Sequence, residues 1–287
     1  MFVGRGGDGS FRRLRHRLCP LVVAGHRDTL LRIDKRRPVV LIEHGSGQSY
    51  GGDPNPHVAR HRCYAGGTGR AAAMFLHPNE HAAGRDRAAY PDARVEVVGP
   101  LRHAQLATIP RHAPADRPVL AFTFHWDCHA CPETRTSWHV FASAIAEAVA
   151  SDRFADVVAT AHPRLWTLVR SEFARLGARP VESFAGVLAE ADVLAADNTT
   201  AMFDWAALRG PTVVLNPPFY RRDVDHGLRF WSAAGIGPNV DAPGDVCDAA
   251  LEAAAGPWPG ADAALAQVWA PVDDPAQAAV DAVLSLL

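Results

Sequence analysis

The chain has 287 residues, a mean hydropathy of −0.06 and a formal net charge of −2, which indicate a globular protein of one large domain or two ordinary ones. No run approaches the ~20 apolar residues of a membrane span, and no long apolar stretch follows the N-terminal arginines, so neither a membrane span nor a secretory signal is expected. Five scattered cysteines, an odd number, argue against a disulfide framework and favour a reducing, cytoplasmic location.

The charge is divided unevenly along the chain. Residues 1–117 hold 19 of the 29 Lys and Arg and 10 of the 31 Asp and Glu, a balance of +9, which leaves −11 for residues 118–287. Such segregation predicts that the N-terminal part meets a polyanion. The alternative is that the two oppositely charged parts attract each other across an interface.

Short apolar runs alternate with amphipathic segments along most of the chain. The runs predict strands at 21–24, 39–43, 73–76, 95–98, 119–123, 157–160, 193–196 and 212–215. The amphipathic segments predict helices at 137–150, 165–176, 184–190, 200–208, 244–254 and 275–287. This alternation predicts an α/β fold with parallel sheets and helices on both faces. Three prolines within 109–118 predict a linker, and therefore two lobes, residues 1–116 and 117–287.

The N-terminal segment is rich in arginine, whose planar guanidinium suits phosphate through a two-pronged hydrogen bond. The residues expected to bind a phosphate-rich partner are Arg12, Arg13, Arg15 and Arg17. A solvated arm without a partner is the alternative interpretation.

His44 follows the second predicted strand and enters a glycine-rich loop. Histidine has the side-chain pKa nearest to neutral, so it suits the deprotonation of an acceptor hydroxyl. We expect His44 to be the general base, with Gln48 and Tyr50 of the same loop on the acceptor. Glu43 is expected to point to the opposite face of the strand. An ordinary loop histidine is the alternative.

The segment after the strand at 119–123 offers two interpretations. Cys128 and Cys131 have the spacing of a zinc-binding pair, but a second ligand pair at finger-like spacing is missing. Ordinary packing of this loop is the other interpretation.

His162 and Arg164 come just past the strand at 157–160, at the edge where open α/β sheets bind ligands. Their positive charge would stabilise a diphosphate leaving group. No Asp-x-Asp stands in the context of a divalent-metal clamp, so we expect a metal-independent mechanism.

The polar cluster after the strand at 193–196 is the most informative feature of the sequence. Asn198, Thr199 and Thr200 are typical N-cap residues, so backbone N–H groups should point outward there and attract phosphate. Asp204 lies one helical turn further on, where its carboxylate could accept hydrogen bonds from two ribose hydroxyls. The cluster predicts a nucleotide site, with a capped helix and a solvated Asp204 as the alternative.

Three motifs in this order resemble the GT-B superfamily of glycosyltransferases. They are the His44–Gly45 pair, the sequence at 161–164 with its His-Pro pair, and the cluster at 197–204. Over residues 38–235 the chain is most similar to the CDP-glycerol glycerophosphotransferase-like branch, with UDP-N-acetylglucosamine 2-epimerases as cousins. The resemblance implies two Rossmann-like lobes facing an interlobe cleft, an acceptor-binding first lobe that is reduced here, and a donor-binding second lobe. It also implies that the C-terminal helix packs back on the first lobe. The loop after the first strand of the second lobe is implied to face the cleft, which favours a place for His125 and Trp126 beside the donor.

We therefore expect a glycosyltransferase that moves a sugar from a nucleotide-sugar donor, linked through UDP or CDP, to a hydroxyl of a polyanionic acceptor. No further cofactor and no metal are expected. The first expectation for the acceptor is hydroxymethylpyrimidine in DNA, as in phage DNA modification, which places the protein in a bacterial or phage-infected cell. The alternatives are a CDP-glycerol or polyol-phosphate transferase of wall teichoic-type polymers and a non-catalytic nucleotide or nucleic-acid binding module.

Overall fold

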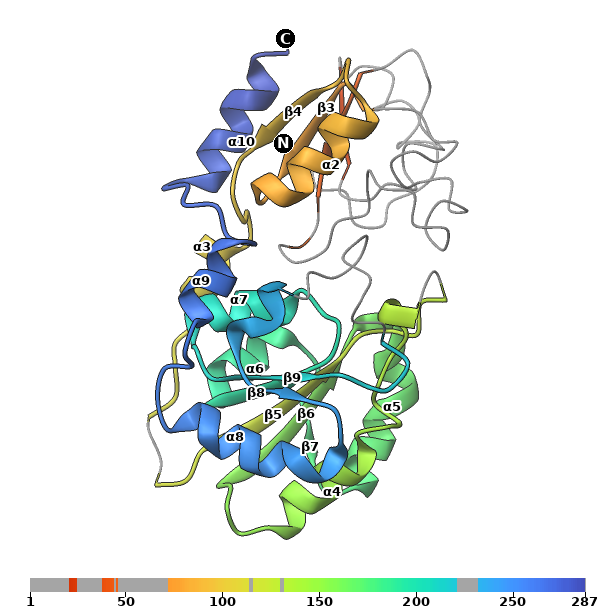
Figure 1. The fold of residues 1–287 in the computed structure, drawn as a ribbon, viewed down its shortest axis with the longest axis vertical. Helices are drawn as coiled ribbons and strands as arrows, with labels where there is room; N and C mark the ends of the chain where they lie inside the picture. The colour runs from red at the N-terminus through yellow and green to blue at the C-terminus, as the bar shows by residue number, and fades with distance from the viewer. Residues whose placement is uncertain are drawn as a thin grey trace, which may run out of the picture.

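The computed structural model describes residues 21–24, 38–43, 45, 72–113, 116–129, 132–220 and 232–286. Within these ranges the chain forms two parallel sheets, which lie one above the other along the long axis of the molecule (Figure 1). The expected α/β class with parallel sheets is therefore confirmed.

The first sheet has the strand order β1-β2-β3-β4. Its strands are β1 (Val22–Ala24), β2 (Val39–Ile42), β3 (Met74–His77) and β4 (Arg94–Val97). Helix α2 (Glu80–Ala89) packs on β3 and β4, where the rings of Phe75 and Tyr90 stack 5.2 Å apart. The opposite face of the sheet buries Val40 and Met74 against α10 (Pro275–Leu284), so both faces are covered.

The second sheet has the order β10-β9-β8-β5-β6-β7. Its strands are β5 (Val119–Phe124), β6 (Asp156–Ala161), β7 (Arg179–Pro180), β8 (Val193–Ala196), β9 (Thr212–Leu215) and β10 (Asn239–Val240). All four residues of β8 and all six of β5 are buried, as parallel strands covered on both faces require.

Helices cover both faces of this second sheet. One face packs on α4 (Ala142–Ala150), α5 (Pro163–Arg175) and α8 (Val246–Ala254). The other packs on α6 (Phe184–Glu190), α7 (Ala201–Leu208) and α9 (Ala261–Ala266). Three short 3₁₀ helices complete this part, at Pro132–Thr134, Ser232–Ile236 and Pro243–Asp245.

The order of the strands defines where a ligand can enter. From β5 the chain builds outward through β6 and β7, and then returns to the other side of β5 with β8, β9 and β10. The connections therefore leave β5 and β8 in opposite directions, which opens a crevice at the carboxyl ends of these two strands. Both strands are followed by predicted site residues.

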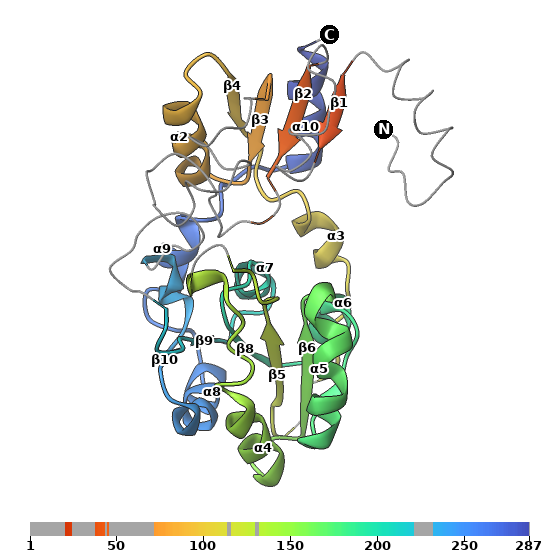
Figure 2. The same ribbon diagram turned by 90° about the vertical axis from the view of Figure 1, so that its right-hand side faces the viewer.

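The chain passes between the two sheets twice. The first passage runs through α3 (His103–Ala107) and the predicted linker, where Arg209 Nη2 donates to Ile109 O at 2.8 Å. On the second passage Asn79 Nδ2 donates to Val268 O at 3.1 Å, and α10 then lies beside β1 and β2 (Figure 2). Residues 275–284 thus pack on the first sheet, where Ala279 is buried.

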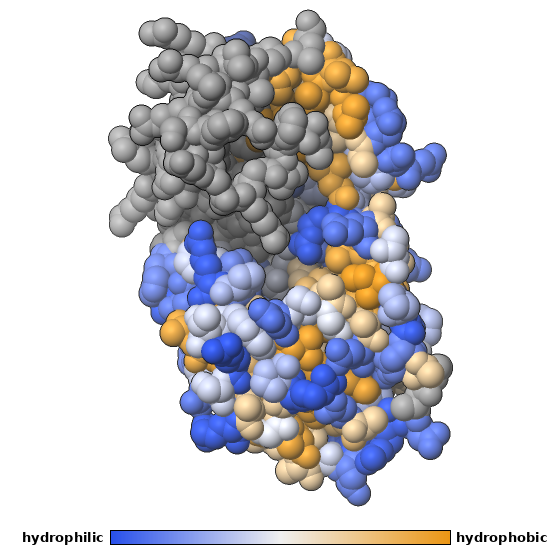
Figure 3. All heavy atoms as spheres, turned by 180° about the vertical axis from the view of Figure 1, so that it is seen from behind, coloured by the Kyte–Doolittle hydropathy of each residue, from blue (hydrophilic) through white to orange (hydrophobic). Residues whose placement is uncertain are grey.

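The outer side of α10 exposes two large apolar side chains beside the polar Gln277 and Asp281. Val280 and Leu284 are 42% and 58% exposed, and Figure 3 shows hydrophobic residues gathered at this end of the molecule. No helix among the described residues is long and apolar enough to cross a bilayer.

One predicted helix begins later than expected. The pattern predicted a helix from residue 137, but α4 begins at Ala142. Ser137 donates through both its amide and its hydroxyl to the Asp197 carboxylate, and the amides of Val140 and Phe141 turn back to Ser137 O. These bonds hold residues 137–141 in a turn because they use the groups that would start a helix.

Candidate active site

Asp197 joins the two central strand ends of the second sheet. Its fully buried carboxylate accepts hydrogen bonds from His125 N at 2.7 Å and from Ser137 N and Oγ at 3.0 and 3.1 Å. Because Asp197 follows β8 and His125 follows β5, these bonds fix the loops on either side of the crevice relative to each other. A site built there is rigid before any ligand binds.

His162 and Arg164 follow the neighbouring strand, β6. The His162 side chain caps α5, since its Nδ1 accepts from Arg164 N at 3.1 Å. In the neutral imidazole the proton therefore lies on Nε2, which is a donor suited to a phosphate oxygen. The Arg164 guanidinium lies 4.6 Å from the centre of the Trp126 ring, a cation–π contact that holds a positive charge beside His162.

His125 lies behind His162. The two rings meet edge to face with centroids 5.5 Å apart, and His125 is only 8% exposed. Its Nδ1 is 3.2 Å from Thr134 O, and since a carbonyl only accepts, this nitrogen carries the proton. In this position the ring of His125 orients His162.

The turn at 198–200 differs in detail from a simple N-cap. Thr200 is the N-cap residue of α7, but its side chain makes no capping bond, whereas Thr199 Oγ1 accepts from Ala201 N at 3.3 Å. Thr199 N donates to Asp197 O. Asn198 is 2% exposed, and its Nδ2 has no hydrogen-bond partner in the part of the chain that the structure describes. Asn198 Nδ2 is thus the buried donor that a ligand at this turn can satisfy.

Asp204 is buried, so the alternative of a solvated aspartate is wrong. It lies in the first turn of α7 at 5% exposure, and burial raises its pKa to about 6, while the positive charge of Arg102 acts in the opposite direction. In this environment the charged form of the Asp204 carboxylate is poorly solvated. A hydrogen bond donated by a hydroxyl or amide group of a ligand would stabilise it.

The first lobe reaches this site through Gly45. Its φ of +116° is a left-handed conformation, and a Cβ built there would overlap the side chain of Thr200, 2.9 Å from its Cβ and Oγ1. Gly45 therefore lies against the N-terminus of α7. His44 itself lies outside the described residues, as do the predicted acceptor residues Arg12, Arg13, Arg15, Arg17, Gln48 and Tyr50.

Gly45→Ala is expected to weaken binding of a nucleoside diphosphate by about tenfold and to lower stability by about 1–2 kcal/mol. The methyl group adds backbone strain and pushes on Thr200. Gly210→Ala is the matched control, because Gly210 has a φ of +96° but nothing within 4 Å of its added Cβ. Calorimetric titration should show weaker binding only for Gly45→Ala, and Thr200→Ser should restore part of it. Equal binding by the two alanine variants would contradict the contact.

The structure describes one of the two cysteines that have the spacing of a zinc-binding pair. Cys128 is a half-buried free thiol and Cys131 lies outside the described residues. The neighbouring Asp127 forms an ion pair with Arg135, whose hydrogen bond lowers the pKa of that carboxyl. The ion pair between Asp127 and Arg135 therefore joins the two ends of this segment at the protein surface.

Two residues near the site had no distinct role in the sequence interpretation. Asp197 was identified only as part of the cluster, and its position directly after a strand is the signal that could have assigned it to the sheet edge. Arg102 lies 102 residues from Asp204 in the sequence and comes near it only through the packing of α3 on α7. No local pattern could have revealed that pair.

No model of a known protein family matches the sequence, and no curated protein matches it. Several solved structures are similar to this chain. A structure of the wall teichoic acid polymerase TagF soaked with CDPG for 30 minutes has a TM-score of 0.62 at 13% identity, over 94% of this chain and 72% of that one. A structure of TagF soaked for 15 minutes has a TM-score of 0.55 at 14% identity, over 88% of this chain and 67% of that one. The structure of an α,α-trehalose-phosphate synthase (UDP-forming) from Burkholderia vietnamiensis has a TM-score of 0.47 at 12% identity, over 96% of this chain and 76% of that one.

The likeness to TagF extends over both sheets of this chain. It confirms the expected GT-B fold, and at this level of identity it concerns the fold alone.

Proposed function

We propose that this protein is a nucleotide-sugar-dependent glycosyltransferase. The observation that carries the proposal is the convergence on one sheet edge of His162 and Arg164, the turn at 198–200 and the buried Asp204, with Gly45 of the other lobe against Thr200. Cationic and N–H donors are what a diphosphate requires, and a carboxylate is what a ribose requires.

In this proposal the second lobe holds the donor. His162 Nε2 and the Arg164 guanidinium lie at the end of β6, and Asn198, Thr199 and Thr200 at the end of β8. The diphosphate would bridge these two groups of donors across the end of β5. Trp126 supports Arg164, His125 supports His162, and Asp204 accepts from the ribose hydroxyls.

The proposed transfer step uses His44 as the base. His44 takes the proton of the acceptor hydroxyl, and the acceptor oxygen forms a bond to the sugar carbon. The bond from that carbon to the diphosphate oxygen breaks, and the nucleoside diphosphate leaves with the electron pair. The donors at the ends of β6 and β8 stabilise the charge that develops on the leaving group.

For the acceptor we propose a polyanion, first hydroxymethylpyrimidine in DNA, because of the +9 balance of residues 1–117. A polyol-phosphate polymer is the second candidate, with a CDP-linked polyol as donor. One observation favours it: the solved structures with this fold include TagF, a wall teichoic acid polymerase soaked with CDPG. Both acceptors carry phosphate and match the same charge.

A thermal-shift screen with UDP, GDP, CDP and CMP tests the donor site. We expect one of these nucleotides to raise the melting temperature, and the double variant Thr199→Val/Thr200→Val to lose most of that shift. The activated donor of the stabilising nucleotide should then release free nucleoside diphosphate, or CMP, when an acceptor is added. Binding without release would show a non-catalytic module, and no shift with any nucleotide would contradict the donor site.

Acceptor binding is measured with duplex DNA at ~50 and ~200 mM salt. Each neutralised phosphate contributes a slope of roughly −0.9 in log K against log salt, so replacing Arg12, Arg13, Arg15 and Arg17 by Gln should flatten the slope. Mass spectrometry of hydroxymethylated DNA after incubation with the donor detects the product. Absence of DNA binding at low salt would contradict the DNA acceptor and favour the polyol-phosphate acceptor. Loss of thermal stability in the Gln variant would indicate that the arginines instead bind the acidic second lobe.

A further inference from the structure

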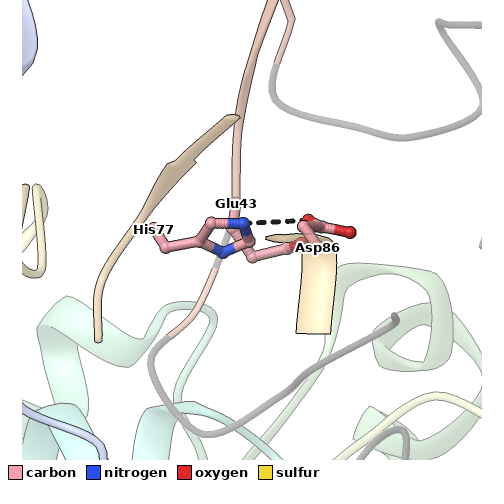
Figure 4. Close-up of side chains that lie close together, drawn as sticks. All are labelled: Glu43, His77 and Asp86. Carbon is pink, nitrogen blue, oxygen red and sulfur yellow. Dashed lines mark ion pairs between the residues drawn. The ribbon is translucent and has the colours of Figure 1, made fainter. Parts of the chain in front are cut away.

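Three ionisable side chains meet in the interior of the first lobe, away from the donor site. Glu43 follows β2, His77 ends β3, and Asp86 comes from α2 (Figure 4). They are 8%, 1% and 0% exposed, and one ligand atom of each lies within 4.8 Å of the others. In the sequence, Glu43 is directly followed by the His44–Gly45 pair.

The contact between His77 and Asp86 has an unusual geometry. His77 Nε2 is 2.8 Å from Asp86 Oδ2, close enough for an ion pair. Even so, neither ring nitrogen of His77 makes a hydrogen bond of acceptable angle within the described part of the chain. A nitrogen and a carboxylate oxygen this close without a well-aligned hydrogen bond are compatible with two ligands turned toward a third atom.

Metal–ligand distances agree with this interpretation. Tetrahedral zinc with bonds of about 2.0 Å places its ligand atoms about 3.3 Å apart, so small side-chain rotations bring all three atoms onto one ion. Imidazole and carboxylate are both common zinc ligands.

The summed charge of Glu43, His77 and Asp86 also favours a bound cation. By themselves two carboxylates and a protonated imidazole sum to −1, and a cation placed among buried carboxylates lowers the cost of burying their charge. A divalent cation with a neutral imidazole brings the sum of this group to zero. The alternative for the same three side chains is an ionic triad without metal.

From these observations we propose that Glu43, His77 and Asp86 bind a divalent transition-metal ion, of which Zn²⁺ is the best match to one nitrogen and two oxygen ligands. The ion would tie together β2, β3 and α2, close to the backbone bond from Glu43 N to Leu76 O that joins the first two. It fixes the strand end from which the His44–Gly45 pair emerges. The site is separate from the donor diphosphate, for which no metal clamp was expected.

The test starts with the full-length wild-type protein, stripped with a chelator and titrated with Zn²⁺. We expect binding of about one ion per chain and a rise in melting temperature, and Co²⁺ should give the visible absorption bands of a low-coordinate site. Asp86→Asn and His77→Gln should each weaken Zn²⁺ binding by more than about tenfold. His112→Gln is the matched control, because that histidine pairs with Asp192 in the second lobe and should bind Zn²⁺ like the wild type.

Two results would overturn the proposal. One is a wild-type protein that binds no Zn²⁺, Mn²⁺ or Co²⁺ and keeps its melting temperature throughout the titration, as an ionic triad predicts. The other is Zn²⁺ binding that is unchanged in Asp86→Asn and His77→Gln, which would assign the ion to surface histidines. The circular dichroism spectrum of each metal-free variant shows whether it is folded, so the outcome is independent of the transferase proposal.

Discussion

His44→Ala is expected to lose on the order of 10²–10⁴ fold in turnover while its affinity for the nucleotide stays that of the wild type. The reason is that the proposed mechanism assigns donor binding to the second lobe and deprotonation of the acceptor to the first. The donor groups lie on the second sheet, whereas His44 adjoins Gly45, the residue of the first lobe that lies against Thr200. In the proposed mechanism His44 acts on the acceptor hydroxyl and does not contribute to binding of the donor.

Single-turnover kinetics and calorimetric titration separate the two effects, and the acidic limb of the pH–rate profile should disappear in the variant. His129→Ala is a suitable control, because His129 is exposed and pairs with Asp127 at the surface. Normal turnover with a normal pH profile in His44→Ala would remove the base from this position. Asp127 is a poor replacement, since Arg135 lowers the pKa of its carboxyl.

Asp204→Asn is expected to make the free protein more stable at neutral pH and to weaken nucleotide binding. The folded-state pKa of about 6 lies above the usual 3.8, so the folded protein holds a proton that the unfolded chain has released. Stability therefore falls as the pH rises from about 4 to about 6. Above that range the penalty is complete, at about 3 kcal/mol for a shift of about two units. Asparagine removes the penalty because it carries no charge.

The same variant should bind nucleoside diphosphate about 1–3 kcal/mol more weakly, because a charge-assisted hydrogen bond to the ribose is lost. Melting curves between about pH 4 and pH 8 check the stability effect: the advantage of Asp204→Asn should be largest at neutral pH and vanish near pH 4. Asp248→Asn is the control, an exposed carboxylate paired with Arg153 whose loss should change either quantity by less than about 0.5 kcal/mol. A pH-independent difference, or unchanged affinity, would contradict the assigned role.

The sequence alone located most of the second lobe. The strands at 193–196 and 212–215 and the helix at 184–190 have the predicted bounds, because buried parallel strands are continuous apolar runs and amphipathic helices repeat every three to four residues. It also placed the histidine and threonine motifs at strand ends, since polar residues directly after such runs mark the edge of the sheet. The helix α2 was missed because its sequence, with Gly84 and few apolar residues, has no clear hydrophobic face.

The tertiary structure decided how these local pieces meet. Strand order brought the ends of β5 and β8 together and gave Asp197 its three donors, which no periodicity encodes. Burial by segments distant in the sequence raised the pKa of Asp204 and enclosed Glu43, His77 and Asp86 in one lobe. A sequence pattern reports which residues prefer the interior, but the solvation and charge of a carboxylate depend on what packs over it. That packing is set by the whole chain.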